Sequence, residues 1–493
     1  MSRSRSPEQI LAELARRRTA DAPTHGGRVL SYVYDSGLAE LDELAAGAAA
    51  LVQPVNALDP TVFGSVASLE RDLISFARTA FHGPEAIGSV TSGGTESCIL
   101  AVKAARDLAG VAAGRGSIVL PSTAHAAFDK AAALLGVRAV RVPVDPVTTA
   151  VTVEAMAAAI DEQTFLLVAS APNYPTGTMD PIEDLGALAS ARGVPLHVDA
   201  CLGGFALAWW PEPLPAWDFR VPGVTSISAD LHKYGYAPKG ASLLLHTDRD
   251  RHRAGFFATT DWPGYPVVNP TLLGSRSAAG LASAWAIAEY LGPAGFSALV
   301  ADIAAATARL RAVVDDIDGL RVTGHPAGPV FAVTADPAST SPIDPHRWSS
   351  AVADHGFTLQ AQPRYVQSDG TLLPASTHLT VTPVTAGVLE ELSAALRAGA
   401  ADARGAGAAQ PPQALAGLTD AFADGTLTVD DALALPSEAV EAALIGAGID
   451  PHTDPSGAAE ALDLPAVIAA IESLPRPVTA KMLTEFLAAY GNP

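Results

Sequence analysis

Short apolar runs alternate with helix-like stretches through the middle of the chain, and this alternation constrains the fold most. The helix-like stretches are rich in alanine, as in residues 126–135 and 182–191. Apolar strands separated by helices are typical of a largely parallel sheet covered on both faces, so we predict an α/β fold. Ligands of such sheets bind at the carboxyl ends of strands. The predicted strands are 117–121, 139–144, 165–170, 196–199, 225–229 and 242–245.

A chain of 493 residues is long enough for more than one domain, at roughly 100–200 residues each. We predict an N-terminal segment (1–66) that contributes to the active site, a large domain (67–291) and a smaller α/β domain (292–400). Residues 401–493 form a C-terminal extension that begins with an Ala/Gly/Gln/Pro-rich linker up to residue 412. Its expected helices are 414–423, 429–435, 437–445, 464–471 and 479–490.

Within the large domain, residues 68–81 have the spacing of an amphipathic helix. Leu69, Leu73, Phe76 and Ala80 share one face, and Ser68 is the expected N-cap.

The net charge of -21 argues against nucleic acid or an anionic membrane as a partner, since both attract basic proteins. The extension carries much of this charge, with 13 acidic and 3 basic residues. The two cysteines, Cys98 and Cys201, cannot make a disulfide framework. We find no apolar signal core at the N-terminus and no uncharged apolar run near ~18 residues. We therefore expect a cytoplasmic protein without a membrane span, and we predict no metal site.

Lysine is scarce in this chain, so each lysine is a stronger candidate for a specific chemical role. The chain has five, Lys103, Lys130, Lys233, Lys239 and Lys481. A lysine can lose a proton and form an imine, which an arginine cannot. Lys233 follows a predicted strand and lies in a turn rich in Tyr, Gly and Pro. This makes Lys233 a candidate for imine chemistry; the alternative is a solvated loop lysine.

A glycine-containing loop, TSGGTES at residues 91–97, follows a predicted strand and opens a helix that runs to about Leu108. Glycines let the backbone approach a phosphate, and the first N–H groups of the helix favour an anion. Thr95 adds a hydroxyl. The loop is neither a Walker motif nor a dinucleotide motif, and many helices begin this way without a ligand.

Two further residues follow predicted strands. Asp199 ends an apolar strand, where an unpaired carboxylate would be costly, so it needs a cationic partner such as a protonated pyridine nitrogen or else caps the next turn. His125 opens a helix, where its ring can lie flat on a planar cofactor or simply cap the helix.

The motifs TSGGTES, HAAFDKAA, LHVDACLGGF, SISADLHKYGYAPKGASLLLH and TDW occur in this order. Together they closely resemble the sphingosine-1-phosphate lyases, a branch of the group II pyridoxal-phosphate decarboxylases. The resemblance runs from about Gly27 to Ala400. It implies an aspartate-aminotransferase-type fold (fold type I), pyridoxal 5'-phosphate as cofactor, a small-molecule amine as substrate, and a homodimer with a shared active site.

The resemblance also implies roles for single residues. Lys233 forms the Schiff base with the cofactor, Asp199 pairs with the pyridine nitrogen, and His125 stacks on the ring and moves protons. The residues that hold the cofactor phosphate are Gly94, Thr95 and His232, with Gly274 and Ser275 contributed to the neighbouring subunit. On the substrate side, Tyr34 matches a family tyrosine, and Lys239 matches a lysine that binds the substrate phosphate.

Two stretches depart from the family pattern on the substrate side. Where the family has Asn-Pro-Leu-His-Pro, this chain has Asn56-Ala-Leu-Asp59-Pro60. A carboxylate at Asp59 would repel a substrate phosphate by about 1–4 kcal/mol, unless Asp59 only starts a turn. Asn173 likewise begins Asn-Tyr-Pro-Thr-Gly where the family has Gln-Phe-Pro-His-Gly.

These residues predict a carbon–carbon lyase that cleaves an amino alcohol phosphate or a related amine by retro-aldol chemistry. Decarboxylation of an amino acid is the alternative, because the bond held perpendicular to the cofactor ring decides which one breaks. A cofactor-free scaffold is a third possibility, which the joint presence of Lys233, Asp199 and His125 disfavours. The substrate and the role of the extension stay open.

Overall fold

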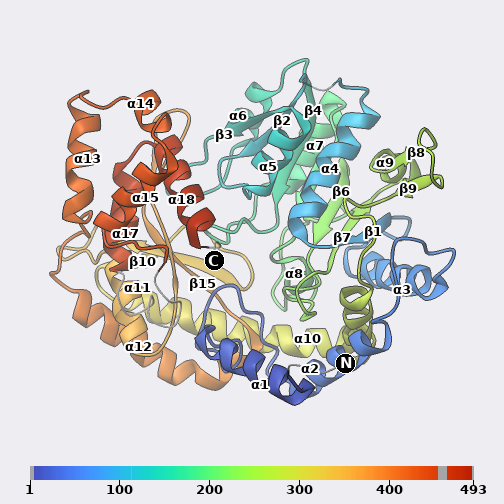
Figure 1. Ribbon diagram of the computed structural model, residues 1–493, viewed down its shortest axis with the longest axis horizontal. Helices are drawn as coiled ribbons and strands as arrows, with labels where there is room; N and C mark the ends of the chain where they lie inside the picture. Colours follow the sequence, from blue (N-terminus) through green and yellow to red (C-terminus); the bar gives the residue numbers. More distant parts are fainter. Residues whose placement is uncertain (1–4, 113, 453–462, 491–493) are drawn as a thin grey trace.

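The computed structural model describes residues 5–112, 114–452 and 463–490, and its largest element is a seven-stranded sheet (Figure 1). The strand order is β1-β7-β6-β5-β4-β2-β3; β3, β2, β4, β5 and β6 are parallel, and β7 is antiparallel to both neighbours. The strands are β1 (Ile87–Thr91), β2 (Ser117–Pro121), β3 (Arg138–Val142), β4 (Thr164–Ser170), β5 (Leu196–Asp199), β6 (Val224–Ala229) and β7 (Ser242–His246). This confirms the predicted α/β fold.

Both faces of the sheet are buried, because alternate side chains of its strands enter two different hydrophobic clusters. In β2, Ile118 and Leu120 pack with α4 (Gly94–Leu108) and α5 (Ala127–Leu135), whereas Val119 belongs to the cluster that contains α7 (Ile182–Arg192). The shorter helices of this domain are α6 (Val153–Ala159), α8 (Gly204–Leu207) and α9 (Arg249–Ala254), followed by the hairpin β8 (Phe257–Thr259) and β9 (Val267–Asn269). With both faces covered, the strand ends are the open places for polar chemistry.

The predicted amphipathic helix is present, but its start was predicted wrongly. Helix α3 runs over Gly64–Ala80, with Phe63 as N-cap, and Ser68 lies inside it and is exposed. The helix begins earlier because Val66 is 1% exposed and adds a turn to the buried face that holds Leu73. That burial outweighs the N-cap preference of serine.

Helix α10 (Ala279–Asp315) joins the large domain to the smaller one. Its backbone leaves the helical conformation at Gly292, before Pro293, where we predict the smaller domain to begin. Within the part of the chain that the structure describes, α10 alone is long and apolar enough to cross a membrane. Core helices of soluble proteins also meet that test, and α10 packs against α2 (Ala39–Leu51) and α3.

The smaller domain is an antiparallel sheet, in the order β10-β11-β15-β12, packed with helices α11 and α12. Its elements are β10 (Leu320–Val322), β11 (Val330–Ala335), α11 (Pro345–Asp354), β12 (Gln360–Gln362), β13 (Tyr365–Val366), β14 (Leu372–Leu373), β15 (Ser376–Thr380), η2 (Pro383–Val388) and α12 (Leu389–Ala403). Helix α12 ends at Ala403, so the linker starts three residues later than predicted. The N-terminal segment also contains α1 (Pro7–Arg17) and η1 (Arg18–Ala20).

The C-terminal extension is helical, as predicted (Figure 1). Its side chains form a hydrophobic cluster of their own. Its described helices are α13 (Gln413–Ala423), α14 (Val429–Leu433), α15 (Ser437–Gly446), α17 (Leu464–Ser473) and α18 (Arg476–Tyr490). It is attached to the smaller domain through the β13–β14 hairpin. The Arg476 guanidinium lies 3.9 Å from the ring centre of Tyr365, and a carboxylate oxygen of Glu472 accepts a 2.8 Å hydrogen bond from the backbone N–H of Arg364.

Candidate active site

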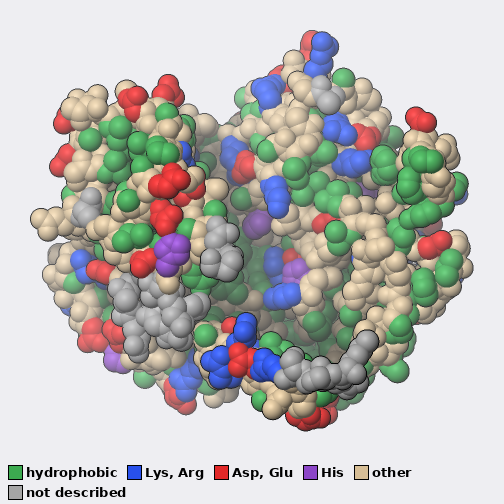
Figure 2. Space-filling model, viewed as in Figure 1, with side chains coloured by type: hydrophobic (Ala, Val, Ile, Leu, Met, Phe, Trp, Pro, Cys, Tyr) green, Lys and Arg blue, Asp and Glu red, His purple; other side chains and the backbone are tan. Residues whose placement is uncertain are grey.

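A cavity of about 400 Å³ opens at the carboxyl ends of the parallel strands. Figure 2 shows a hollow between the large domain and the body formed by the smaller domain and the extension. Six predicted cofactor residues line this cavity: Gly94, Thr95, His125, Asp199, His232 and Lys233. They come from different strand ends, as the α/β prediction requires.

The glycine loop is held in place by a buried glutamate that follows it. One carboxylate oxygen of Glu96 accepts hydrogen bonds from the backbone N–H (2.7 Å) and the hydroxyl (2.5 Å) of Ser92, and the other accepts from the N–H of Leu272 (2.6 Å). Gly94 is required at its position for a steric reason, in addition to the close approach of a phosphate that the sequence predicts. A Cβ atom there would lie 2.8 Å from both carboxylate oxygens of Asp230 and 2.9 Å from the Cys201 sulfur.

Lys233 is paired with a buried carboxylate. Its Nζ lies 3.0 Å from Oδ2 of Asp230, and Nε2 of His232 lies 3.4 Å from the same oxygen. Burial alone would raise the pKa of Asp230, but the positive charge of Lys233, and that of His232 when its ring is protonated, hold this pKa below its ordinary value. Burial lowers the pKa of His232, so its ring is neutral near pH 7.

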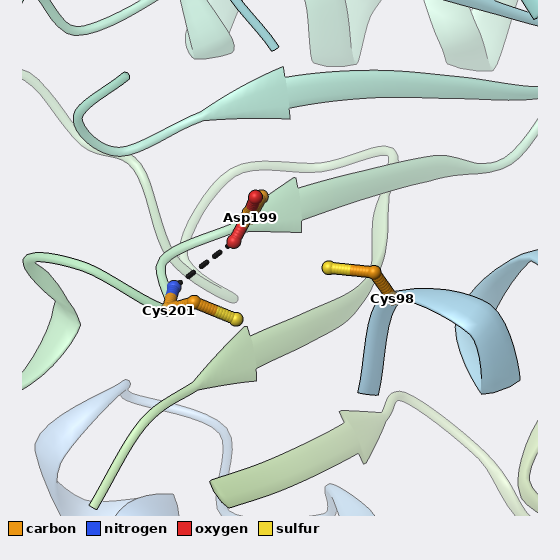
Figure 3. Close-up of side chains that lie close together, drawn as sticks. All are labelled: Cys98, Asp199 and Cys201. Atoms are coloured by element: carbon orange, nitrogen blue, oxygen red, sulfur yellow. Dashed lines mark hydrogen bonds between the residues drawn. The ribbon is translucent and has the colours of Figure 1, made fainter. Parts of the chain in front are cut away.

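Asp199 is 7% exposed and lines the cavity beside two thiols (Figure 3). Its Oδ1 accepts hydrogen bonds from the backbone N–H of Cys201 (3.0 Å) and from the Ser228 hydroxyl (3.3 Å). Among the described residues, no ion pair joins Asp199 to a cationic side chain. A carboxylate of Asp199 and the sulfurs of Cys98 and Cys201 lie within 4.8 Å of one another, which would suit a soft metal ion. Burial raises the pKa of the Cys201 thiol, however, and so opposes the thiolate that a metal needs.

His125 is exposed and lines the cavity. One of its two ring nitrogens has a defined hydrogen-bond partner. Its Nδ1 accepts a 3.1 Å hydrogen bond from the backbone N–H of Ala127 at the start of α5. In the neutral ring the proton is therefore on Nε2. His125 thus accepts from the first backbone N–H of α5 and also lines the cavity, and its stacking on a cofactor ring stays a prediction.

Tyr34 and Lys239 lie together near Lys233. The Nζ of Lys239 is 4.6 Å from the ring centre of Tyr34 and donates a 3.0 Å hydrogen bond to the carbonyl of His232. Partial desolvation, with the nearby charge of Lys233, lowers the pKa of Lys239 to about 8, although this residue remains exposed at the protein surface. Burial raises the pKa of Tyr34 to about 12. This pair is suited to bind an anionic group of a substrate.

Asn173, a predicted substrate residue, does not line the cavity. It is 1% exposed, and its Oδ1 accepts hydrogen bonds from the backbone N–H and the hydroxyl of Thr176, both at 3.0 Å. Asn173 therefore shapes the turn. Its neighbour Tyr174 lines the cavity instead and stacks on His378, with 4.3 Å between ring centres.

The remaining predicted residues lie around a second cavity of about 480 Å³ near α3 and the β8–β9 hairpin. Nδ2 of Asn56 donates a 3.2 Å hydrogen bond to the Ser275 hydroxyl, next to Gly274. Asp59 lines this second cavity, and its Oδ1 accepts from the backbone N–H (2.9 Å) and the hydroxyl (2.6 Å) of Thr61. Within one chain, Asp59 thus starts a turn, and it does not face the cofactor cavity.

The first cavity fits pyridoxal phosphate. It contains a buried carboxylate, Asp199, that needs a cation, and a lysine, Lys233, that can form an imine. The N-terminus of α4 and His232 supply donors for a phosphate. The family model described as "Pyridoxal-dependent decarboxylase conserved domain" matches residues 66–259, which include these groups.

The relatives agree with this match. The solved structure of Burkholderia pseudomallei K96243 sphingosine-1-phosphate lyase is 34% identical, with a TM-score of 0.75, covering 87% of this chain and 96% of that one. The chain belongs to the pyridoxal-dependent decarboxylase family, in the branch that is similar to the sphingosine-1-phosphate lyases. The sphingosine-1-phosphate lyase of Drosophila melanogaster is 39% identical over 71% of this chain, and that of Mus musculus is 36% identical over 76%.

This chain spans about three fifths of the length of these curated relatives, 62% of the Drosophila protein and 64% of the mouse protein. A glutamate decarboxylase of Lactobacillus brevis, 20% identical with a TM-score of 0.71, has the same fold. The cofactor of this family is pyridoxal phosphate.

Sequence reasoning missed Asp230 and Tyr174 as cavity residues. Asp230 had a signal like the one that identified Asp199, because Asp199 ends the apolar strand β5 and Asp230 directly follows the apolar strand β6. For Tyr174 no comparable signal exists, since the side chain that enters the cavity from residues 173–177 depends on the turn.

Proposed function

We propose that this protein is a pyridoxal-phosphate-dependent carbon–carbon lyase that cleaves an amino alcohol phosphate or a related amine into an aldehyde and a smaller amine. The observation that carries the proposal is the convergence of Lys233, Asp199 and His125 on one cavity beside the N-terminus of α4. When bound, the cofactor supplies an electron sink for the carbon that bears the substrate amine.

The chain's own residues then have separate tasks. Lys233 would hold the cofactor through an imine. Asp199, whose carboxylate is oriented by hydrogen bonds from Cys201 and Ser228, would keep a proton on the ring nitrogen. His125 lies at the cavity with its proton on Nε2, where it can give or take a proton from a substrate hydroxyl.

Retro-aldol cleavage is favoured over decarboxylation by the comparisons. The curated relatives named above, at 36–39% identity, are sphingosine-1-phosphate lyases, whereas the glutamate decarboxylase is 20% identical and supports only the fold. Lys239 beside Tyr34 offers a cation for a substrate phosphate. The electrostatic objection from Asp59 is weakened, because within one chain that carboxylate belongs to the other cavity.

The proposal includes a cytoplasmic homodimer. Large apolar side chains are exposed from the β8–β9 hairpin to the segment before Gly274; they are Phe257, Trp262, Tyr265, Val268, Leu272 and Leu273. An apolar patch of this kind is typical of a protein interface. Gly274 and Ser275 adjoin it, as a contribution to a neighbouring subunit requires. Sedimentation at falling concentration tests this: the monomer should lose cofactor, and a fully loaded, active monomer would contradict the shared site.

The reaction itself is tested by incubating the purified protein with long-chain amino alcohol phosphates and, separately, with a panel of amino acids. The proposal expects an aldehyde from the former. Release of carbon dioxide from an amino acid would instead support the decarboxylase. A lysine-bound cofactor absorbs near ~420 nm. If the purified protein lacks this absorbance, the third possibility, a cofactor-free scaffold protein, is supported.

A further inference from the structure

Asp230 lies directly against the lysine that the proposed function depends on. The two residues are three positions apart in one turn after β6, and the backbone N–H of Lys233 donates to the carbonyl of Asp230 (3.3 Å). The side chain of Lys233 therefore folds back, so that Nζ lies 3.0 Å from Oδ2 of Asp230. The Asp230 side chain is 2% exposed and that of Lys233 21%, so the pair lies in the lining of the cavity with its carboxylate buried.

Stability does not explain such a pair. The cost of removing two charges from water largely cancels their attraction, and apolar replacements are often as stable. The surroundings are also adapted to the carboxylate, since a side chain at Gly94 would collide with both of its oxygens. A function for Asp230 must therefore be found in the chemistry of Lys233.

The carboxylate opposes the nucleophilic form of the lysine. Burial alone would lower the pKa of Lys233, but the negative charge of Asp230 raises it above its ordinary value. The other titratable groups near Lys233 are Tyr34, Asp199, Cys201, His232 and Lys239. Lys239 provides a contrast within the same chain: no ion pair joins it to a carboxylate among the described residues, and its pKa is lowered to about 8.

We propose that Asp230 is a positioning residue that receives Lys233 as an ammonium ion whenever this lysine is not bonded to the cofactor. The inference rests on the proposed function. A substrate arrives as an ammonium ion, and its nitrogen forms the bond to the cofactor's aldehyde carbon as the bond from that carbon to Nζ breaks. The three hydrogens of the substrate ammonium end on Nζ, so charge and atoms balance. Asp230 stabilises that ammonium and keeps the released lysine from attacking again.

The test measures the protonation of Lys233 without turnover. The full-length protein, freed of cofactor, is exposed briefly to an acetylating reagent from pH 6 to 10, and labelling of each lysine is followed by peptide mass spectrometry. In the wild type, Lys239 should react with a midpoint near pH 8, and Lys233 should stay unreactive well above it. In Asp230→Asn, Lys233 should react at least tenfold faster at pH 8, a shift of one pH unit or more.

Two further variants separate the proposal from misfolding. Asp230→Glu keeps the charge and should restore protection of Lys233, and Asp59→Asn, in the other cavity, should leave its labelling unchanged. The labelling of Lys239 reports whether the pocket is folded. Slow labelling of Lys233 in Asp230→Asn with Lys239 reacting normally would overturn the proposal.

A second measurement uses the rate at which added pyridoxal phosphate becomes borohydride-fixed at pH 7. The Asp230→Asn protein should capture it at least tenfold faster than the wild type, since its free lysine is less protonated; equal or slower capture would count against the proposal. If the cofactor is fixed elsewhere, the proposed function fails, while the labelling result for Asp230 and Lys233 still stands.

Discussion

Six of the residues predicted to bind the cofactor and two of those predicted to bind the substrate, Asn56 and Asp59, lie in differently built parts of the molecule. The cofactor cavity collects side chains from the ends of β1, β5 and β6 and from the loop after β2, all within one sheet. Asn56, Asp59, Gly274 and Ser275 instead surround or adjoin a second cavity beside an exposed apolar hairpin. One chain thus brings six of the eight predicted cofactor residues together, whereas Gly274, Ser275 and the substrate residues Asn56 and Asp59 are not brought to that cavity.

The largest effect on turnover is expected when the lysine that is predicted to bind the cofactor is removed. Lys233→Ala should abolish turnover and remove the borohydride-reducible bond to the cofactor, because the other lysine nearby, Lys239, is held by the carbonyl of His232. Turnover and covalently retained cofactor are measured together. Lys130→Ala, an exposed lysine on α5, is the matched control and should behave as wild type. Turnover by Lys233→Ala would contradict the assignment of Lys233 as the lysine that binds the cofactor.

Asp199→Asn should lower kcat by about a hundredfold or more, the scale on which removal of one buried electrostatic partner acts. The amide keeps the shape of the side chain but cannot balance a positive charge on the cofactor ring. Steady-state kinetics with a saturating substrate give the value. The control is Asp250→Asn, at an exposed carboxylate paired only with Arg253 on α9. An unchanged kcat would show that Asp199 is structural.

Lys239 differs from the predicted substrate residues Asn56 and Asp59, because it lies near the cofactor cavity. Partial desolvation lowers the pKa of its side chain to about 8, so the ammonium form is full below that pH and is lost as the pH rises through it. KM for a phosphorylated substrate should therefore increase above pH 8 by up to about tenfold per unit. Lys239→Arg, which stays charged, should flatten this profile. The same pH dependence in both proteins would exclude Lys239 from substrate binding.

The smallest effect is expected at Asp59. Its carboxylate accepts two hydrogen bonds from Thr61 in a turn outside the cofactor cavity. Asp59→His should cost about 1 kcal/mol of folding stability through loss of this turn, and change kcat/KM for a phosphorylated substrate less than threefold. Thermal unfolding and kinetics measure the two effects. An improvement of tenfold or more would mean that Asp59 lies near the substrate phosphate, as its departure from the family pattern predicts.

Prediction from the sequence succeeded where function depends on the ends of regular strands. The position of Asp199 after an apolar strand was enough to place it at the cavity, and the same argument would have found Asp230. Prediction failed where the conformation of a single turn decides which side chain enters the cavity. Asn173 points into its own turn, whereas Tyr174 lines the cavity. The start of α3 was missed because the burial of Val66 outweighs the capping preference of Ser68. Contacts over long sequence separation, such as Asn56 to Ser275, leave no local pattern.

The most direct test of the account is to find the lysine that carries the cofactor. The purified protein is reduced with borohydride and digested, and the peptide that bears the pyridoxyl group is sequenced by mass spectrometry. The account predicts a single modified residue, Lys233, within the peptide that contains Asp230 and His232. A pyridoxyl group on Lys239 or on any other lysine, with Lys233 unmodified, would contradict it.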